Sequence, residues 1–232
     1  MSVVEQGLSG ARGGTVDRLV RLLRDGIVNH RYAPGQRLIE ADLTRDMGVS
    51  RGPLREAFRR LAAEGLLDMV PNRGAVVRRL SFREMKELFE IRIALEALAV
   101  RCAATVIDHG DNRAAFEDAI APIWSEQPRM SGAAYHEENR RFHQAILDAC
   151  GNLQLAELSR QLQLPLIMLQ LSGAMSIEMY HDSVAEHRAI AGAILDGDAD
   201  AAEAALRRHL ERAAKVVDAM PRDIFRPSAE TL

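Results

Sequence analysis

Aromatic residues, cysteines and long hydrophobic runs are scarce in this sequence of 232 residues. Aromatics make up 4% of it, whereas Ala, Leu, Arg and Glu are abundant, a composition that favours helix. No apolar run approaches the roughly 20 residues that span a bilayer, and the first residues lack the basic start and apolar core of a secretion signal. Cys102 and Cys150 lack CxxC spacing and are expected to be reduced thiols. These absences indicate a cytoplasmic protein without a membrane anchor.

The net charge of −3 conceals an uneven distribution. Residues 1–80 hold 14 Arg and no Lys against 9 Asp plus Glu, a balance of +5. Residues 81–232 hold 16 basic and 24 acidic residues, a balance of −8. Such asymmetry predicts two domains with different partners, the basic one facing a polyanion.

The first 80 residues contain the pattern of a helix-turn-helix followed by a hairpin. Apolar residues at helical spacing predict helices at 15–30, 39–47 and 50–64. Gly48 and Gly65 end the second and third helices, as glycine commonly does at a helix C-terminus. Two β-prone runs then flank the turn Pro-Asn-Arg-Gly, which predicts a hairpin. This order is that of a winged helix-turn-helix.

From Ser81 onward the pattern is helical almost to the end of the chain. Six helices are predicted, at 82–108, 111–127, 131–149, 152–174, 176–197 and 198–218. Pro165 is expected to kink the fourth. The expected fold class is therefore mainly α, an N-terminal winged helix-turn-helix with a small β-hairpin wing followed by an all-α six-helix bundle. The expected domains are a disordered lead-in, the winged domain, the bundle and a frayed tail, at 1–13, 14–80, 81–220 and 221–232.

The helix predicted at 50–64 carries two rows of side chains. One is an apolar stripe formed by Leu54, Ala57, Phe58 and Leu61. The other, on the adjacent face, comprises Arg51, Arg55 and Arg59. A solvated basic edge is one interpretation, but the preceding turn, the following hairpin and the room that Gly52 leaves favour nucleic acid. Arginine binds phosphates and pairs with the guanine edge in the major groove, so this pattern predicts a recognition helix.

The segment GQRLIEADLTRDMGVSRGPLREAFRRLAAEGLLDMVPNRGAVV resembles the DNA-binding domain of the GntR family of bacterial transcription regulators. The resemblance implies that Ser50, Arg51, Arg55 and the wing tip Arg73-Gly74 contact DNA. Gly52 stands where many members have threonine, and Ala41 where many have an arginine that touches DNA. Both departures remove side-chain contacts, which leaves the operator sequence open.

Three of the seven histidines form a pattern with an asparagine. Asn139 and His143 are four residues apart on one predicted helix, and His187 and His209 lie on two others among apolar positions. Inward histidines are often core residues, but three from three helices also suit Zn, Ni or Mn, with coordination positions left open. Both interpretations stand on spacing alone. The remaining histidines are expected at the surface, namely His30, His109, His136 and His181.

Residues 82 to about 218 resemble the FCD domain, the effector-binding half of FadR-type regulators, through ELFEIRIALEALAVRCAA, NRRFHQAILDACGN and EHRAIAGAI. Six helices suggest the VanR-like subgroup. The resemblance implies a divalent metal held by Asn139, His143, His187 and His209. It also implies that Arg92 lines the effector pocket, although an i,i+4 pair with Glu96 is an equally good role.

The sequence therefore predicts a homodimeric repressor that binds an inverted repeat in double-stranded DNA and a small carboxylate-containing effector near the metal. Activation instead of repression stays open. The alternative is a metal-dependent hydrolase with a DNA-binding appendage, in which Glu186 or Glu138 serves as base. A nucleoid protein without an effector is a weaker third hypothesis, because it leaves the inward histidines unexplained.

Overall fold

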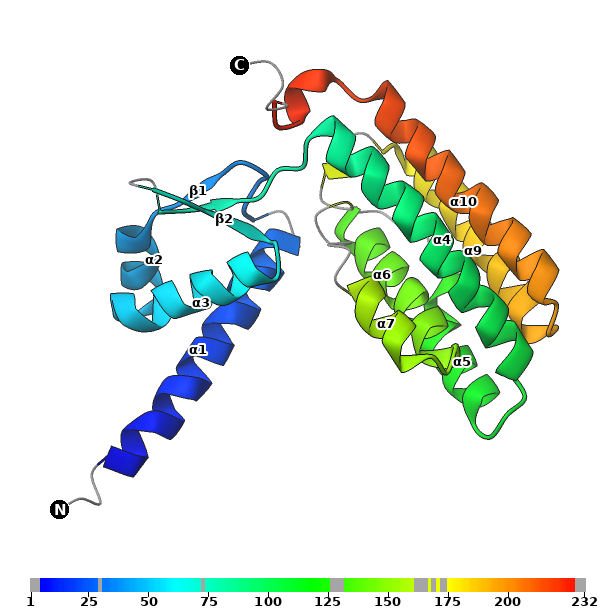
Figure 1. The fold of residues 1–232 in the computed structure, drawn as a ribbon, viewed down its shortest axis with the longest axis horizontal. Helices are drawn as coiled ribbons and strands as arrows, with labels where there is room; N and C mark the ends of the chain where they lie inside the picture. Colours follow the sequence, from blue (N-terminus) through cyan, green and yellow to red (C-terminus); the bar gives the residue numbers. More distant parts are fainter. Residues whose placement is uncertain are drawn as a thin grey trace. The chain divides into compact units, whose positions relative to one another are not determined.

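The computed structural model describes residues 5–28, 31–71, 74–125, 132–160, 167, 170–171 and 175–227. The chain divides into two compact units, one built on residues 1–79 and the other on 80–164 and 171–232. Figure 1 shows the helices and the small sheet of the first unit and the helical bundle of the second. None of the described helices is long and apolar enough to cross a membrane.

The helices of the first unit enclose one small core. α1 (Glu5–Val28) packs against α3 (Arg51–Ala63), and α2 (Glu40–Met47) packs against α3 as well. Gly48, in the left-handed conformation with φ 63°, ends α2 as predicted. Fully buried side chains from α1 and α3 fill the core, namely Leu19, Leu23, Ile27, Leu54, Phe58 and Leu61.

The start of α1 differs from the sequence prediction. The helix begins at Glu5, so residues 5–13 are helical and the expected disordered lead-in is wrong for them. The packed part of α1 nucleates the helix, and each further residue then adds one hydrogen bond without a new nucleation cost. Residues 1–4 lie outside the described part of the chain.

The wing is confirmed and includes a strand that the sequence did not predict. β2 (Leu67–Val70) and β3 (Gly74–Val77) form the expected antiparallel hairpin. β1 (Arg37–Leu38) pairs with the other edge of β3, so the sheet order is β1-β3-β2. A two-residue strand carries almost no sequence signal, because its partner lies far along the chain.

The second unit is organised around α4 (Phe82–Val106). This helix begins with a capping box, in which Ser81 and Glu84 satisfy each other's backbone N–H groups. α10 (Ala199–Ala219), α6 (Gly132–Ala149) and α9 (Ile177–Leu195) all pack against it. Their buried residues, among them Val100, Phe142, Ile190 and Leu206, form one apolar core.

The shorter helices of the bundle refine the predicted boundaries. α5 (Asn112–Ile120) ends earlier than predicted and gives way to the 3-10 turn η1 (Ala121–Trp124), because Pro122 has no N–H to continue an α-helix. α7 (Leu153–Arg160) begins as predicted. Pro165, with most of 161–174, lies outside the described residues.

Residues 220–227 fold back onto the start of α4, and we call them the C-terminal strap. The 3-10 turn η2 (Arg222–Ile224) lies within it, and Phe225 is buried with its ring edge-on to Phe82, the centroids 5.5 Å apart. The Arg226 N–H donates to the Leu80 carbonyl at 3.1 Å. The expected frayed tail is therefore wrong for 221–227, because Phe225 has an apolar partner. Residues 228–232 are outside the described part.

Candidate DNA-reading face and buried histidine cluster

α3 presents three distinct faces. Its apolar stripe is fully buried, as predicted, at Leu54, Ala57, Phe58 and Leu61. A second face meets α1, where Arg60 donates to Asp17 at 2.7 Å. Arg51, Arg55 and Arg59 lie on the outer face and are exposed. Three guanidinium groups in a row are thus available to a polyanion.

Two arginines of this outer row have acidic neighbours. Arg55 Nε donates to both carboxylate oxygens of Glu40 on α2 at 2.9 Å, and Arg59 donates to Glu56 at 3.3 Å. The hydrogen bond to Glu40 and the charge of its carboxylate raise the pKa of Arg55. Arg55 is nevertheless 57% exposed and Arg59 71%. Glu40 therefore orients Arg55 while its outer N–H groups stay open to solvent.

Ser50, Gly52 and Gly74 are the other described residues that the sequence predicts at DNA. Ser50 is the N-cap of α3 and exposed, but its hydroxyl makes no cap hydrogen bond. A Cβ on Gly52 would meet no atom within 4 Å, so this position is open as predicted. Gly74 begins β3 with φ 78°, a conformation that favours glycine. Arg73 lies outside the described residues.

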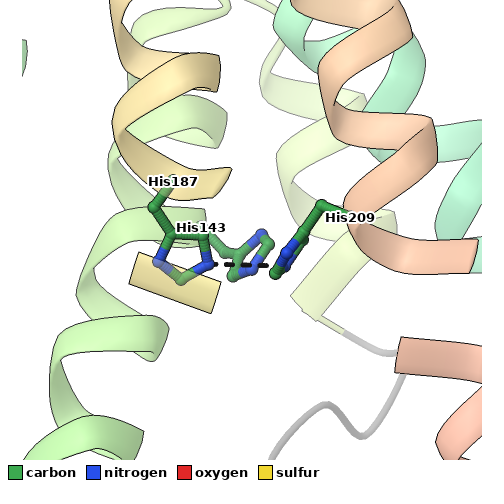
Figure 2. A group of neighbouring side chains, drawn as sticks. All are labelled: His143, His187 and His209. Carbon is green, nitrogen blue, oxygen red and sulfur yellow. Dashed lines mark hydrogen bonds between the residues drawn. The ribbon is translucent and has the colours of Figure 1, made fainter. Parts of the chain in front are cut away.

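Three buried imidazole rings from three helices face one another in the second unit (Figure 2). His143 comes from α6, His187 from α9 and His209 from α10, and none is more than 3% exposed. One ring nitrogen of each lies within 4.8 Å of those of the other two. The Nε2 atoms of His187 and His209 are 3.3 Å apart. The structure thus brings together the three histidines that the sequence singled out.

A buried ion pair on α4 fixes the ring of His143. The Nδ1 atom of His143 donates to Glu96 Oε2 at 2.6 Å, while Arg92 Nε donates to Glu96 Oε1 at 2.6 Å. Arg92 Nη2 donates to His143 Nε2 at 3.1 Å. Both roles expected for Arg92 are therefore compatible, because the i,i+4 pair with Glu96 places its guanidinium beside the histidines.

A second carboxylate fixes His209 in the same way. The Nδ1 atom of His209 donates to Glu186 Oε2 at 2.7 Å. Arg212, one turn further along α10, donates to both oxygens of Glu186 at 2.6 and 2.7 Å. A carboxylate on the second ring nitrogen orients the ring and leaves Nε2 as the atom that can ligate a metal.

Burial and these ion pairs set the protonation of the cluster. Burial lowers the pKa of all three histidines, well below the usual value for His187 and to about 4 for His209. Burial alone would raise the pKa of Glu186, but the hydrogen bonds from His209 and Arg212 outweigh it and lower that pKa to about 2. Burial also opposes ionisation of Glu96, but the charge of Arg92 and the hydrogen bonds from His143 and Arg92 outweigh it, so the pKa of Glu96 is lowered. Neutral imidazoles beside ionised carboxylates are the forms that a metal requires.

The donor set fits a divalent transition metal. Two nitrogens about 2.1 Å from one metal lie about 3.0–3.4 Å apart, and the His187 and His209 Nε2 atoms meet this condition at 3.3 Å. His187 Nδ1 is buried and has no hydrogen-bond partner among the described residues. Three neutral imidazoles suit zinc, nickel or manganese and leave positions open for an anion.

Asn139 lies one helical turn before His143 and is 2% exposed. Its Oδ1 accepts a long hydrogen bond of 3.4 Å from the Tyr135 hydroxyl, which shares a bond of 2.6 Å with Ser183. Its Nδ2 has no partner among the described residues. Asn139 is thus only weakly held, as expected of an amide that can turn its oxygen to another partner.

Sequence reasoning missed several members of this site. Glu96 and Arg212 were not expected there, and Glu186 was considered only as a catalytic base, a role that its lowered pKa and its bonds to His209 and Arg212 disfavour. The one available signal was adjacency, since Glu186 directly precedes His187. His136, expected at the surface, is 6% exposed, and its ring lies 5.5 Å from that of Tyr135.

Comparison with known proteins agrees with both halves of the architecture. Residues 15–77 match the family described as bacterial regulatory proteins, gntR family, and residues 87–212 match the FCD domain. The "Probable D-xylose utilization operon transcriptional repressor" of Paenarthrobacter nicotinovorans is 33% identical over 186 residues, covering 79% of this chain and 80% of that one. The uncharacterized HTH-type transcriptional regulator YdhC of Bacillus subtilis is 33% identical over 145 residues, covering 59% of this chain and 61% of its own length.

Among solved structures, E. coli McbR/YncC has a TM-score of 0.75 at 21% identity, covering 88% of this chain and 97% of that one, which supports the fold. The chain is a winged helix-turn-helix protein with an all-helical second unit. It belongs to the GntR family of bacterial regulatory proteins, and its second unit is an FCD domain. It is therefore a DNA-binding transcription regulator and not an enzyme, since its relatives are named as regulators. The VanR-like subgroup stays a prediction.

Proposed function

We propose that this protein is a repressor that binds an inverted-repeat operator as a homodimer and responds to a small carboxylate effector bound near a metal. A two-fold dimer presents two recognition helices to two half-sites, so the operator mirrors the symmetry of the protein. Effector binding between the helices of the second unit would change the spacing or orientation of the two readers and so weaken operator binding.

The outer face of α3 is the observation that carries this proposal. Arg51, Arg55 and Arg59 project from one exposed face of a helix that follows a tight turn. Gly52 leaves the same face open, so that the helix backbone can come close to a groove. Glu40 holds Arg55 from behind, which reduces the entropy that the side chain loses when it meets a guanine or a phosphate.

The metal part of the proposal rests on the buried histidines. Asn139 would add an amide oxygen to the Nε2 atoms of His143, His187 and His209. A divalent metal there would supply Lewis acidity and positive charge, and Arg92 would bind the effector carboxylate. Zinc, nickel and manganese all suit this donor set.

Substitution of the outer arginines tests the DNA reader. Arg51→Ala and Arg55→Ala should each weaken binding to an operator selected from random DNA by about 1–3 kcal/mol if the arginine pairs with a base. Arg60→Ala is the matched control, because Arg60 lies on the same helix but faces Asp17 of α1. Binding by both variants at wild-type affinity would overturn the assignment of α3 as the recognition helix.

Elemental analysis tests the metal. Protein purified without chelator and without an affinity tag should carry about one transition-metal ion per chain, and His143→Ala, His187→Ala and His209→Ala should each lose it. His181→Ala is the control, because His181 is an exposed histidine on α9. A wild-type protein that carries no metal and gains no thermal stability from zinc, nickel or manganese would show that the histidines are core or direct effector contacts.

A further inference from the structure

The buried pair Arg92–Glu96 interacts with the atom that a metal would use on His143. His143 Nδ1 carries the ring hydrogen and donates a hydrogen bond to Glu96, so Nε2 of the neutral ring has a single lone pair. That lone pair accepts a hydrogen bond from Arg92 Nη2 at 3.1 Å. One lone pair cannot bind a guanidinium N–H and a metal at the same time.

We propose that Arg92 competes with the metal for His143 Nε2. Metal binding then displaces the Arg92 guanidinium from His143, and the displaced guanidinium binds a carboxylate effector. The inference rests on the proposed metal site and deepens it. Arg92 then determines specificity in two ways, as a competitor of the metal and as the partner of the anion.

The charges of the site explain why an anion should follow the metal. Two guanidinium groups, of Arg92 and Arg212, are balanced by two carboxylates, of Glu96 and Glu186. The four proposed metal ligands are neutral, so a divalent ion adds two uncompensated positive charges to the buried histidine cluster. Buried charge is costly unless it is paired, and one or two carboxylates of an effector would pair it.

The anchoring of Arg92 explains why the freed guanidinium stays in the site. Its Nε donates to Glu96 at 2.6 Å, through an atom that does not contact His143. Arg92 is 2% exposed, so its guanidinium is held inside the second unit. Loss of the bond to His143 therefore leaves Nη2 with an unpaired donor beside the metal. An unpaired buried donor is itself unfavourable, and a carboxylate oxygen satisfies it.

Metal and carboxylate should consequently strengthen each other's binding. The coupling is reciprocal, since a factor by which the carboxylate raises metal affinity is the factor by which the metal raises carboxylate affinity. The effector class that this geometry favours is a small acid with at least one carboxylate, and a dicarboxylate neutralises the added charge completely.

The experiment measures the nickel affinity of the full-length, tag-free protein by competition with a chromophoric chelator. Each titration is done with and without succinate as the probe anion, and the nickel that succinate itself binds is subtracted. Arg92→Lys keeps the positive charge but replaces the two nitrogens that contact Glu96 and His143 with a single ammonium nitrogen on a side chain without the guanidinium fork, and Arg92→Gln also loses the charge. Without succinate, both should bind nickel about tenfold or more tightly than the wild type, because a charge-assisted hydrogen bond no longer competes. Arg83→Gln is the control, because Arg83 makes an exposed i,i+4 pair with Glu87 on the same helix.

Succinate should raise the nickel affinity of the wild type about tenfold and that of Arg92→Gln clearly less. If both variants bind nickel with the affinity of the wild type, Arg92 does not compete with the metal, although the metal site itself stands. Absence of coupling between nickel and succinate in the unmodified protein would overturn the proposed role of Arg92 as well, even if the variants fail to fold. A wild type that binds no nickel, zinc or manganese would instead overturn the proposed metal site.

Discussion

Asn139 is the residue on which the charge of the histidine cluster depends. Its amide is neutral and buried, and within the described part of the chain its Oδ1 accepts a single long hydrogen bond, from Tyr135. A carboxylate at the same position would place a negative charge beside three neutral imidazoles. Such a charge should destabilise the folded protein without a metal, because a buried unpaired ion is unfavourable. It should stabilise the protein with a metal bound, because the metal then pairs with the carboxylate.

Asn139→Asp should therefore shift stability in two directions. Without metal, the variant should unfold at a lower temperature than the wild type, and with bound zinc at a higher one. Zinc affinity should rise about tenfold, equivalent to about 1.4 kcal/mol. Thermal unfolding with chelator and with zinc measures both signs.

Asn152→Asp is the control, since Asn152 is exposed and its Oδ1 accepts the Leu155 N–H at the start of α7. It makes the same change of charge outside the cluster and should leave zinc affinity unchanged. Equal zinc affinities of Asn139→Asp and the wild type would mean that Asn139 is not a ligand.

Helices were the part of the fold that the sequence could predict, because their signals are local. The stripe on α3 and the glycine that ends α2 lie within a few residues of the structure they specify. β1 could not be predicted, since Arg37 pairs with Val76 and nothing near Arg37 indicates it. The end of α5 does have a local signal, because Pro122 has no N–H to continue the helix.

The candidate site shows the same division between local and distant signals. Three histidines at inward positions could be selected from helical spacing. Their carboxylate partners could not, because Glu96 lies 47 residues from His143 and Glu186 lies 23 from His209. Those contacts depend on how α4, α6, α9 and α10 pack, which periodicity does not specify.

Two glycines on helices of the first unit have opposite packing environments, so substitution by alanine should change stability in opposite directions. A Cβ on Gly26 of α1 would lie 2.5 Å from the buried Tyr32 ring, whereas on Gly52 of α3 it would meet nothing within 4 Å. Gly26→Ala should cost about 1–3 kcal/mol through overpacking. Gly52→Ala should stabilise α3 by up to about 1 kcal/mol, because alanine favours helix over glycine.

Hydrogen exchange of α1 and α3 amides in the full chain measures both effects, as faster exchange for Gly26→Ala and slower for Gly52→Ala. Gly52→Ala should also weaken operator binding, because the added methyl group lies on the face proposed to approach DNA. A variant that gains stability and keeps full operator affinity would show that this face does not come close to a groove.

For the whole molecule, the division into two units predicts separable properties. Residues 80–232 expressed alone should sediment as a dimer, and residues 1–80 alone should be monomeric and bind operator weakly, since one half-site gives fewer contacts. Sedimentation at micromolar concentration measures the first, and titration of labelled operator the second. A monomeric 80–232 fragment would remove the basis for an inverted-repeat operator.

The C-terminal strap brings the two ends of the second unit next to each other. Because the Arg226 N–H bonds the Leu80 carbonyl at 3.1 Å, the first residue of this unit lies beside one of its last. Adjacent ends permit circular permutation, in which the old ends are joined and new ones are opened in an exposed loop.

A permuted unit that joins residue 227 to residue 80 through a short linker and opens at Gly110, in the exposed turn between α4 and α5, should fold cooperatively and unfold within a few degrees of the 80–232 fragment. The same linked unit opened beside the buried Ala97 in α4 should not fold. If the first permutant also fails, the strap does not hold the two ends together in solution. If it succeeds, the order in which these helices occur along the chain is not needed to assemble the histidine cluster.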